Sequence, residues 1–110
     1  MMTQGEIWFV KFTGQGHEYQ NTRPAVVIES DAQLKVTSVI TIVPITKQPE
    51  KHRDDIFIAK DGTNNLLYDS VIKVHQIQTS DPSRFINKIG NVEKEVMDKI
   101  KDYLRRYFAL

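Results

Sequence analysis

The sequence predicts a mainly β domain, a small twisted antiparallel sheet or partly open barrel with one helix at the C-terminus. Three observations support this fold class. Isoleucine (12) and valine (10) far outnumber leucine (5) among 110 residues, and β-branched side chains favour strands over helices. The segments between the apolar stretches are too short for the helical crossovers that a parallel sheet needs. Only the last stretch of the chain has apolar residues at helical spacing.

Five short apolar stretches are predicted as strands. They lie at residues 6–12, 25–28, 37–45, 56–58 and 70–77. Proline has no N–H for a ladder, so Pro24 fits the first position of a strand and Pro44 indicates an edge or a bulge. The Asp-Gly pair within 61–65 is typical of a turn. The last strand alternates, which would put Lys73 and His75 on one face.

The C-terminal segment is predicted as an amphipathic helix that packs on the sheet. From Val92 to Phe108 the apolar residues follow a spacing of 3.6, with charged residues opposite. Asn91 is the expected N-cap, and Arg105 and Arg106 lie near the far end, where the helix dipole favours cations. Before this helix, residues 81–84 (DPSR) indicate a turn or a single helical turn.

Composition excludes several classes of protein. There is no cysteine, which excludes disulfides, a thiolate nucleophile and zinc sites built from Cys ligands. The net charge is +1, so the overall charge does not indicate a nucleic-acid coat protein. No apolar run approaches the ~20 residues that cross a bilayer, and the first residues lack the pattern of a signal peptide. We expect one cytoplasmic domain over residues 1–110.

Few residues are candidates for chemistry. His17, His52 and His75 form no HxH, HxxxH or HExxH pattern. Nucleophile-elbow and P-loop motifs are missing too, so the sequence predicts no metal and no cofactor. Arg23 and Thr46 remain, each at the end of a predicted strand, where a scaffold positions side chains yet leaves them accessible. From the residues alone, the favoured interpretation is that Arg23 forms a surface ion pair and that Thr46 simply ends a strand.

Three ordered motifs resemble the MazF/PemK family of toxin ribonucleases. They read GEIWFVKF at 5–12, GHEYQNTRPAVVI at 16–28 and ITIVPITKQ at 40–48, and the likeness resumes with HQIQTSDPSRF and the C-terminal helix. The resemblance implies a CcdB/PemK-type, SH3-like sheet and a homodimer. It further implies a metal-independent endoribonuclease that cuts single-stranded RNA at short sequences, leaving 2′,3′-cyclic phosphate and 5′-hydroxyl ends, with a cognate antitoxin as partner.

Carried over onto matching positions, the resemblance makes Arg23 and Thr46 the catalytic pair. Arginine presents a planar fork of N–H donors that matches phosphate oxygens. Threonine is no base at neutral pH, but its hydroxyl can donate a hydrogen bond to the same phosphate.

The chain departs from the family pattern where proton transfer is assigned in some relatives. Members commonly read D-Q-[IVP]-R-T-[IL]-D, and this chain has HQIQTSD at 75–81. His75 thus replaces an acid and Gln78 an arginine, while Lys73 stands where some relatives carry arginine. Our hypothesis is that His75, with an ordinary pKa near ~6.5, acts as general base. The alternative is a histidine with a structural hydrogen bond.

The remaining site predictions concern RNA binding. The predicted RNA-binding residues are His17, Glu18, Tyr19, Lys47, Gln48, Lys51, Arg53, Lys73, Gln76 and Gln78. The basic loop after Thr46 either holds phosphates, which gives affinity and salt dependence, or is simply solvated. Trp8 and Phe9 are expected to pack in the core or a dimer interface rather than to stack bases, and Tyr19 is open between a base contact and a solvated loop.

Two rival functions follow from the same fold. One is a CcdB-like toxin that poisons gyrase, which would need no pair of residues acting on phosphate. The other is a catalytically weakened relative that only binds RNA or antitoxin, as the departures at His75 and Gln78 suggest. For the RNA-cleaving toxin, the antitoxin is expected to cover the RNA groove with an acidic, extended segment that folds on binding.

Overall fold

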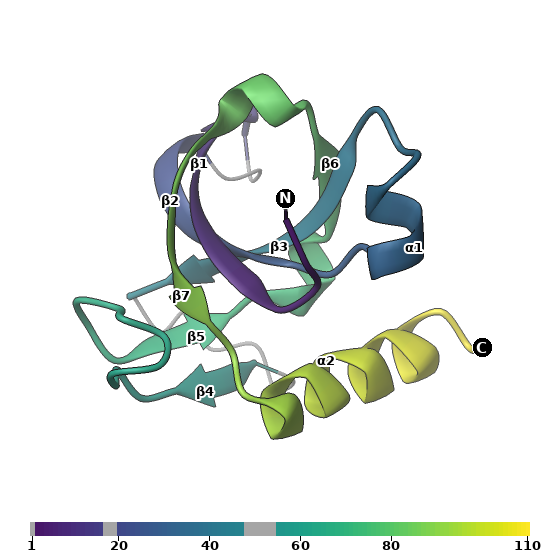
Figure 1. Cartoon of the computed structure of the whole chain (residues 1–110). Helices are drawn as coiled ribbons and strands as arrows, with labels where there is room; N and C mark the ends of the chain where they lie inside the picture. The colour runs from purple at the N-terminus through teal and green to yellow at the C-terminus, as the bar shows by residue number, and fades with distance from the viewer. Residues whose placement is uncertain (1, 17–19, 48–54) are drawn as a thin grey trace.

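The computed structural model describes residues 2–16, 20–47 and 55–110. In this part of the chain there are seven strands, two short 3-10 turns and two helices (Figure 1). The strands are β1 (Glu6–Thr13), β2 (Gln20–Val27), β3 (Ile40–Thr46), β4 (Ile56–Ile58), β5 (Ser70–Ile72), β6 (Gln78–Ser80) and β7 (Phe85–Asn91). The helical elements are α1 (Asp31–Leu34), η1 (Val74–Gln76), η2 (Pro82–Arg84) and α2 (Lys94–Tyr107).

The strands form one antiparallel sheet that bends into a partly open barrel. Its order is β4-β5-β3-β2-β1-β7, and β6 pairs with β3 outside this path. Since η2 joins β6 directly to β7, the strands β6-β3-β2-β1-β7 curl around in the upper half of Figure 1, while β4, β5 and α2 lie below. The predicted fold class, a mainly β open sheet with one C-terminal helix, is confirmed.

Two apolar cores result from the alternation of side chains along the strands. Val26 packs in a core that includes buried residues of α2, while its neighbour Ala25 packs in a second core inside the barrel. On α2 the buried side chains are Met97, Ile100 and Tyr103. The predicted apolar stripe of the helix therefore packs on the sheet, as expected.

The predicted strand 70–77 is confirmed only at β5 (Ser70–Ile72), because η1 occupies residues 74–76 and the pairing with β3 resumes at β6, beyond the predicted stretch. Along β3 the pairing changes from Ile45↔Ile72 to Ile42↔Gln78, which is three residues further on than an unbroken register would give. The three residues of η1 take up this shift. Lys73 and His75 consequently do not share a strand face.

Pro44 gives the physical reason for this interruption. The N–H of Lys73 donates to the backbone oxygen of Pro44 (2.9 Å). The edge of β3 on which this oxygen lies therefore faces the junction between β5 and η1. In a strand the N–H and C=O of one residue point to the same side. Proline offers no N–H there, so the ladder stops and resumes only at β6. Pro44 thus marks a break within a central strand.

Other boundaries also differ from the predictions. β2 begins at Gln20, so Pro24 lies inside the strand and not at its start. Asn91 ends β7 instead of capping the helix, and Glu93 is the N-cap of α2 without a side-chain hydrogen bond. η2 follows Asp81, which caps it as the DPSR sequence suggested. β7 itself was not predicted, because Gly90 is its one buried residue.

A buried carboxylate lies beside the first strand. Glu6 is 6 % exposed and accepts hydrogen bonds from Trp8 Nε1 (2.8 Å) and the Thr3 hydroxyl (3.0 Å), with Lys88 Nζ 3.6 Å away. Burial alone would raise the pKa of Glu6, but these hydrogen bonds and the lysine together lower it below its ordinary value. Glu6 is therefore a charged structural group.

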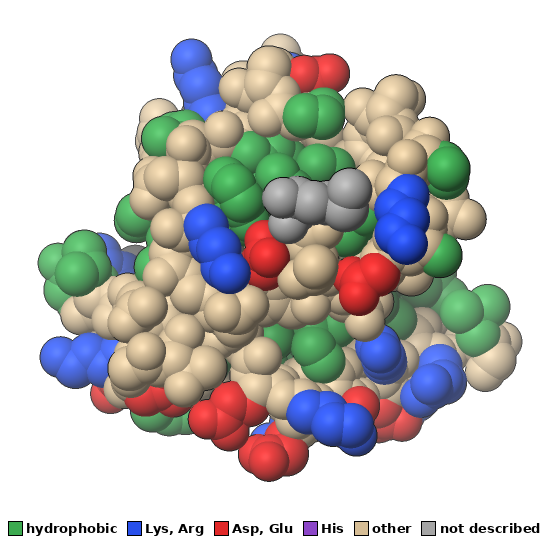
Figure 2. Space-filling model, viewed as in Figure 1, with side chains coloured by type: hydrophobic (Ala, Val, Ile, Leu, Met, Phe, Trp, Pro, Cys, Tyr) green, Lys and Arg blue, Asp and Glu red, His purple; other side chains and the backbone are tan. Residues whose placement is uncertain are grey.

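On the face shown in Figure 2, the described residues form no large basic patch. Lys and Arg side chains alternate there with Asp and Glu, as the net charge of +1 suggests. Among the residues that the structure describes, none of the helices combines the length and the apolar character needed to span a bilayer.

Candidate active site

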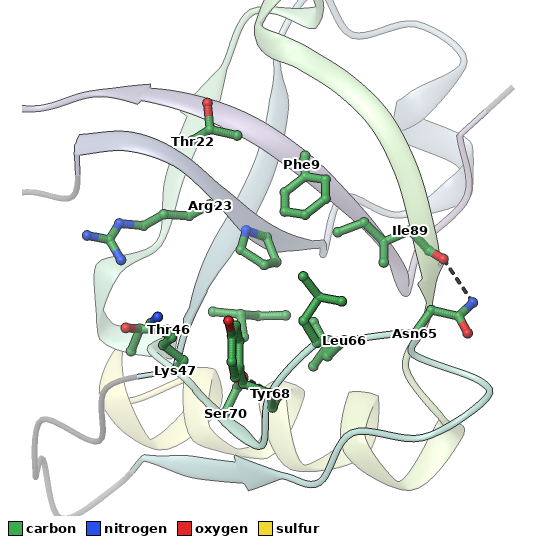
Figure 3. A pocket seen from close by; sticks show the side chains of 13 residues that line it. Phe9, Thr22, Arg23, Thr46, Lys47, Asn65, Leu66, Tyr68, Ser70 and Ile89 are labelled. Atoms are coloured by element: carbon green, nitrogen blue, oxygen red, sulfur yellow. Dashed lines mark hydrogen bonds between the residues drawn. The ribbon is translucent and has the colours of Figure 1, made fainter.

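Two neighbouring strands, β2 and β3, bring Arg23 and Thr46 to one cavity; Thr46 ends β3 as predicted, whereas Arg23 lies inside β2 and not at its end. β2 and β3 pair antiparallel from Val27↔Ile42 to Ala25↔Pro44. Extending this register by two residues puts Arg23 opposite Thr46. Both side chains lie at the same end of one cavity (Figure 3). The sheet register therefore explains how two residues distant in the sequence meet.

The cavity has a volume of about 320 Å³. Its walls come from β1, β2, β3, the start of β5, the end of β7 and the segment 61–69, which we call the 61–69 loop. The lining residues are Phe9, Thr22, Arg23, Pro24, Ile45, Thr46, Lys47, Asn65, Leu66, Leu67, Tyr68, Ser70 and Ile89. This size is at the lower end of the range for small-molecule sites, so it fits part of a polymer chain.

The backbone fixes both members of the pair. Arg23 is half-buried, and its Nε–H donates to the oxygen of Gln20 (3.1 Å), which holds the side chain along β2. Thr46 is only 4 % exposed and pairs with Val71 of β5. A permanent cation and a hydroxyl thus stand at the edge of an apolar cavity. This arrangement suits an anion whose attached groups have apolar faces.

Lys47 and Tyr68 form a cation–π contact at the cavity. Both are exposed, and Lys47 Nζ lies 4.6 Å from the centre of the Tyr68 ring. The prediction that Lys47 belongs to the site agrees with its position, although nothing here tests its contact with RNA. Together with Arg23 it puts two cations at one cavity.

Most of the opposite wall was not predicted. Residues 61–65 were expected to form only a turn, and Phe9 was expected to pack in the core or a dimer interface, whereas in the single chain it is half-buried and lines the cavity. The signal available in the sequence was the run Leu66-Leu67-Tyr68, three large apolar residues directly after turn residues. Such a run in a loop is an exposed apolar patch unless something covers it. Trp8, by contrast, packs beside the barrel core as expected.

Several predicted site residues do not line this cavity. Lys73 is 2 % exposed, and its Nζ lies 2.7 Å from Asp55 Oδ2, so its ammonium group is not presented to RNA and its assignment to RNA binding is not supported. His75 and Gln76 are half-buried in η1, and Gln78 is half-buried in β6. Residues 75–78 lie outside the cavity lining because η1 interrupts the strand that was predicted over 70–77. The general-base role of His75 stays a prediction.

The other predicted RNA-binding residues lie outside the described residues. These are His17, Glu18, Tyr19, Gln48, Lys51 and Arg53. Within residues 2–16, 20–47 and 55–110, no three His, Asp or Glu side chains are grouped as metal ligands.

Comparison with known proteins gives consistent matches over the whole chain. A family model described as "PemK-like, MazF-like toxin of type II toxin-antitoxin system" matches residues 3–108. Endoribonuclease EndoA of Bacillus subtilis is 29 % identical over 112 residues, covering 100 % of this chain and 97 % of the relative. Endoribonuclease MazF9 of Mycobacterium tuberculosis is 31 % identical over 116 residues, covering 100 % and 98 %.

Solved structures show the same fold. The crystal structure of MazF from Deinococcus radiodurans superposes with a TM-score of 0.85 at 21 % identity, covering 99 % of this chain and 97 % of that one. An endoribonuclease from a mycobacterial species, solved in complex with its cognate antitoxin, gives a TM-score of 0.79 at 16 % identity, covering 100 % and 97 %.

Proposed function

Because the chain belongs to the family of PemK-like, MazF-like toxins of type II toxin-antitoxin systems, we propose that it is an endoribonuclease that cleaves single-stranded RNA. The observation that supports this most directly is the meeting of Arg23 and Thr46 at one cavity. Its relatives EndoA and MazF9 are named endoribonucleases. The gyrase poison, the rival on this fold, has no use for two phosphate-directed groups at an apolar cavity.

The proposed reaction is an intramolecular transesterification at the phosphate. The 2′-oxygen of the ribose loses its proton and attacks phosphorus, the bond from phosphorus to the 5′-oxygen breaks, and the departing oxygen gains a proton. The products are a 2′,3′-cyclic phosphate and a 5′-hydroxyl end. Negative charge builds up on the phosphate oxygens in the transition state, so donors aimed at these oxygens accelerate the reaction.

Arg23 and Thr46 supply these donors. The guanidinium stays charged and can give two N–H groups to the phosphate oxygens, and the Thr46 hydroxyl can donate another hydrogen bond. Both are held by strands, so little reorganisation is needed when charge develops. Lys47, at the same cavity, would bind a neighbouring phosphate and make RNA binding salt-dependent.

The test is cleavage of a long mixed-sequence RNA in the presence of EDTA, followed by sequencing of the new 5′ ends. We expect the wild type to cleave, and Arg23→Ala to lose on the order of 100–1000-fold in single-turnover rate. The matched control is Arg106→Ala, which removes an exposed arginine that pairs with Asp102 on α2. Thr46→Val, which keeps the shape but not the hydroxyl, should lose activity, and Thr46→Ser should keep most of it.

Each alternative gives a different result. Cleavage only after magnesium is added, or equal activity of Arg23→Ala and the control, would contradict the proposed mechanism. Intact RNA together with stalled gyrase would support the gyrase poison. RNA binding that weakens with salt, without new 5′-hydroxyl ends, would support a catalytically weakened relative.

We further propose that the protein acts as a homodimer in the cytoplasm and is inhibited by a cognate antitoxin. Large apolar side chains such as Phe57, Ile86 and Phe108 are exposed on the single chain, which favours association. One structural relative was solved with its cognate antitoxin. An acidic, extended antitoxin segment would be attracted by Arg23 and Lys47, so antitoxin should compete with RNA. Light scattering and competition binding test these two proposals.

A further inference from the structure

The 61–69 loop, one wall of the cavity, is held rigid by its own hydrogen bonds. The carboxylate of Asp61 accepts from the N–H groups of Thr63 (2.9 Å) and Asn64 (2.8 Å). The side chain of Asn64, only 2 % exposed, accepts from the N–H groups of Asp61 and Leu66 (3.0 Å each) and donates to Ala59 O (2.8 Å). One buried amide therefore fixes both ends of the turn before the apolar run.

Strand β7 holds the same loop from outside. A Cβ at Gly90 would lie 2.5 Å from Thr63 O, so the loop backbone rests directly on the glycine. The N–H of Asn91 donates to Thr63 O (3.0 Å). Asn65, in the left-handed region (φ 53°), donates from Nδ2 to Ile89 O (3.0 Å; Figure 3). At its far end the loop is tied by Asp69, which accepts from Lys60 N–H (3.0 Å).

This rigid loop presents apolar side chains to solvent at the cavity. Leu67 is 73 % exposed and Tyr68 is 54 % exposed. The fold has ordered these side chains without burying them. An aromatic ring held in this way needs little further ordering when a flat ligand stacks on it, so more of the stacking energy appears as affinity. A nucleobase is such a ligand, and RNA brings one next to every phosphate.

We propose that Tyr68 stacks a base next to the phosphate held by Arg23 and Thr46, and that Lys47 holds this place when RNA is absent. The proposal rests on the proposed function, because the phosphate position comes from it. Lys47 Nζ lies 4.6 Å from the ring centre. An exposed cation–π contact of this kind favours binding only about 2- to 5-fold, whereas stacking of a base on an aromatic ring is worth about 5- to 150-fold. The base therefore displaces the ammonium group, which becomes available to a phosphate.

The test uses short RNAs that contain the cleavage sequence and carry a 2′-O-methyl group at the attacking nucleotide, so that they bind without being cut. Fluorescence anisotropy gives their affinity for the wild type, Tyr68→Phe and Tyr68→Leu. The matched control is Tyr107→Leu, which removes a tyrosine of similar exposure (52 %) from α2. A second RNA series replaces one base at a time with an abasic site. Circular dichroism confirms that each variant is folded.

We expect Tyr68→Phe and Tyr107→Leu to bind within about 2-fold of the wild type, and Tyr68→Leu to bind about 5- to 150-fold more weakly. One abasic position should weaken the wild type by a similar factor and leave Tyr68→Leu unaffected, because the lost contact is the same. Equal losses for Tyr68→Leu and the wild type at every abasic position would overturn the proposal. A Tyr68→Leu variant that binds RNA as tightly as the wild type would also overturn the proposal.

The two proposals fail in different ways. If the wild type cleaves unmodified RNA and Tyr68→Leu binds normally, stacking is wrong and the nuclease stands. If the wild type cleaves no RNA, the proposed function is wrong and no cleavage sequence is defined; anisotropy with single-base homopolymer RNAs then decides whether Tyr68→Leu binds RNA more weakly than the wild type and Tyr107→Leu.

Discussion

The contact between Gly90 and the 61–69 loop can be tested by adding one methyl group. In Gly90→Ala the new Cβ would lie 2.5 Å from Thr63 O and 2.6 Å from Asn64 O. Both atoms belong to the backbone, so no side chain can turn away to make room. The φ of Gly90 is not in the left-handed region, so the cost is steric. Either the loop or β7 must move.

The magnitude follows from two contributions. Overpacking by a methyl group costs about 1–3 kcal/mol. Movement of the loop also weakens the hydrogen bonds from Asn91 N–H to Thr63 O and from Asn65 Nδ2 to Ile89 O, each worth about 1 kcal/mol. We expect the free energy of unfolding to fall by about 2–4 kcal/mol, out of the ~5–15 kcal/mol typical of a domain. The corresponding fall in Tm is roughly 10–15 °C.

Urea denaturation followed by the fluorescence of Trp8, the single tryptophan, measures this change. Gly62→Ala is the matched control, because a Cβ at Gly62 has no heavy atom within 4 Å; it should be neutral or more stable by up to about 1 kcal/mol. RNA cleavage by Gly90→Ala, measured at a temperature at which this variant is still folded, should also be slower than cleavage by the wild type. If Gly90→Ala is as stable as Gly62→Ala, the loop is not held by this contact.

Three further predictions concern groups away from the cavity. The pKa of Glu6 is lowered in the folded protein, so the charged carboxylate stabilises the fold above the ordinary pKa of 4.5. This stabilisation is lost as pH falls through the lower folded pKa. The loss of unfolding free energy between pH 7 and pH 3, measured by urea denaturation, should therefore be smaller for Glu6→Gln than for the wild type. Lys73→Ala leaves Asp55 buried without its 2.7 Å partner and should cost about 3–5 kcal/mol in thermal or urea unfolding, with RNA affinity of the folded protein unchanged. The general-base role of His75, which lies in η1 outside the cavity lining, predicts that His75→Ala removes the limb of the pH–rate profile of RNA cleavage near pH ~6.5; profiles of the same shape for His75→Ala and the wild type would contradict this role.

The sequence predicted the elements that carry a strong local signal. β1 contains a run of strong strand formers and α2 has apolar residues at a spacing of 3.6, and both were predicted to within two residues of their observed ends. β7 escaped prediction, because its pairing with β1 contributes backbone hydrogen bonds and hardly any buried side chains. The break at η1 depends on Pro44 across the ladder, which is a tertiary relation that alternation within 70–77 cannot show.

The same distinction explains which site residues were predictable. Arg23 and Thr46 were assigned through the resemblance, and both line the cavity because they lie on the neighbouring strands β2 and β3, two residues beyond the pair Ala25↔Pro44. Lys73 was also assigned through the resemblance, but it lies buried beside Asp55 and does not line the cavity. Tyr68 depends on the buried amide of Asn64 and on the missing Cβ of Gly90. Neither is visible without the fold.

Arg23 and Thr46 are positioned by other elements than Tyr68 is, and this has a consequence for how the site can vary. The proposed catalytic pair lies on β2 and β3, which are held together by their pairing from Val27↔Ile42 to Ala25↔Pro44, whereas the wall that carries Tyr68 is held by hydrogen bonds within the 61–69 loop and to β7. The two sets share no hydrogen bond among those described above, so substitutions in one should leave the other in place, and their effects should be close to additive. Changes in the loop would then alter which bases are preferred while the position of Arg23 and Thr46, and with it the chemistry at the phosphate, stays the same. A chimaera that exchanges residues 66–68 with those of a relative tests this directly: a changed cleavage sequence at a similar rate agrees with separate supports, and loss of cleavage on every RNA contradicts them.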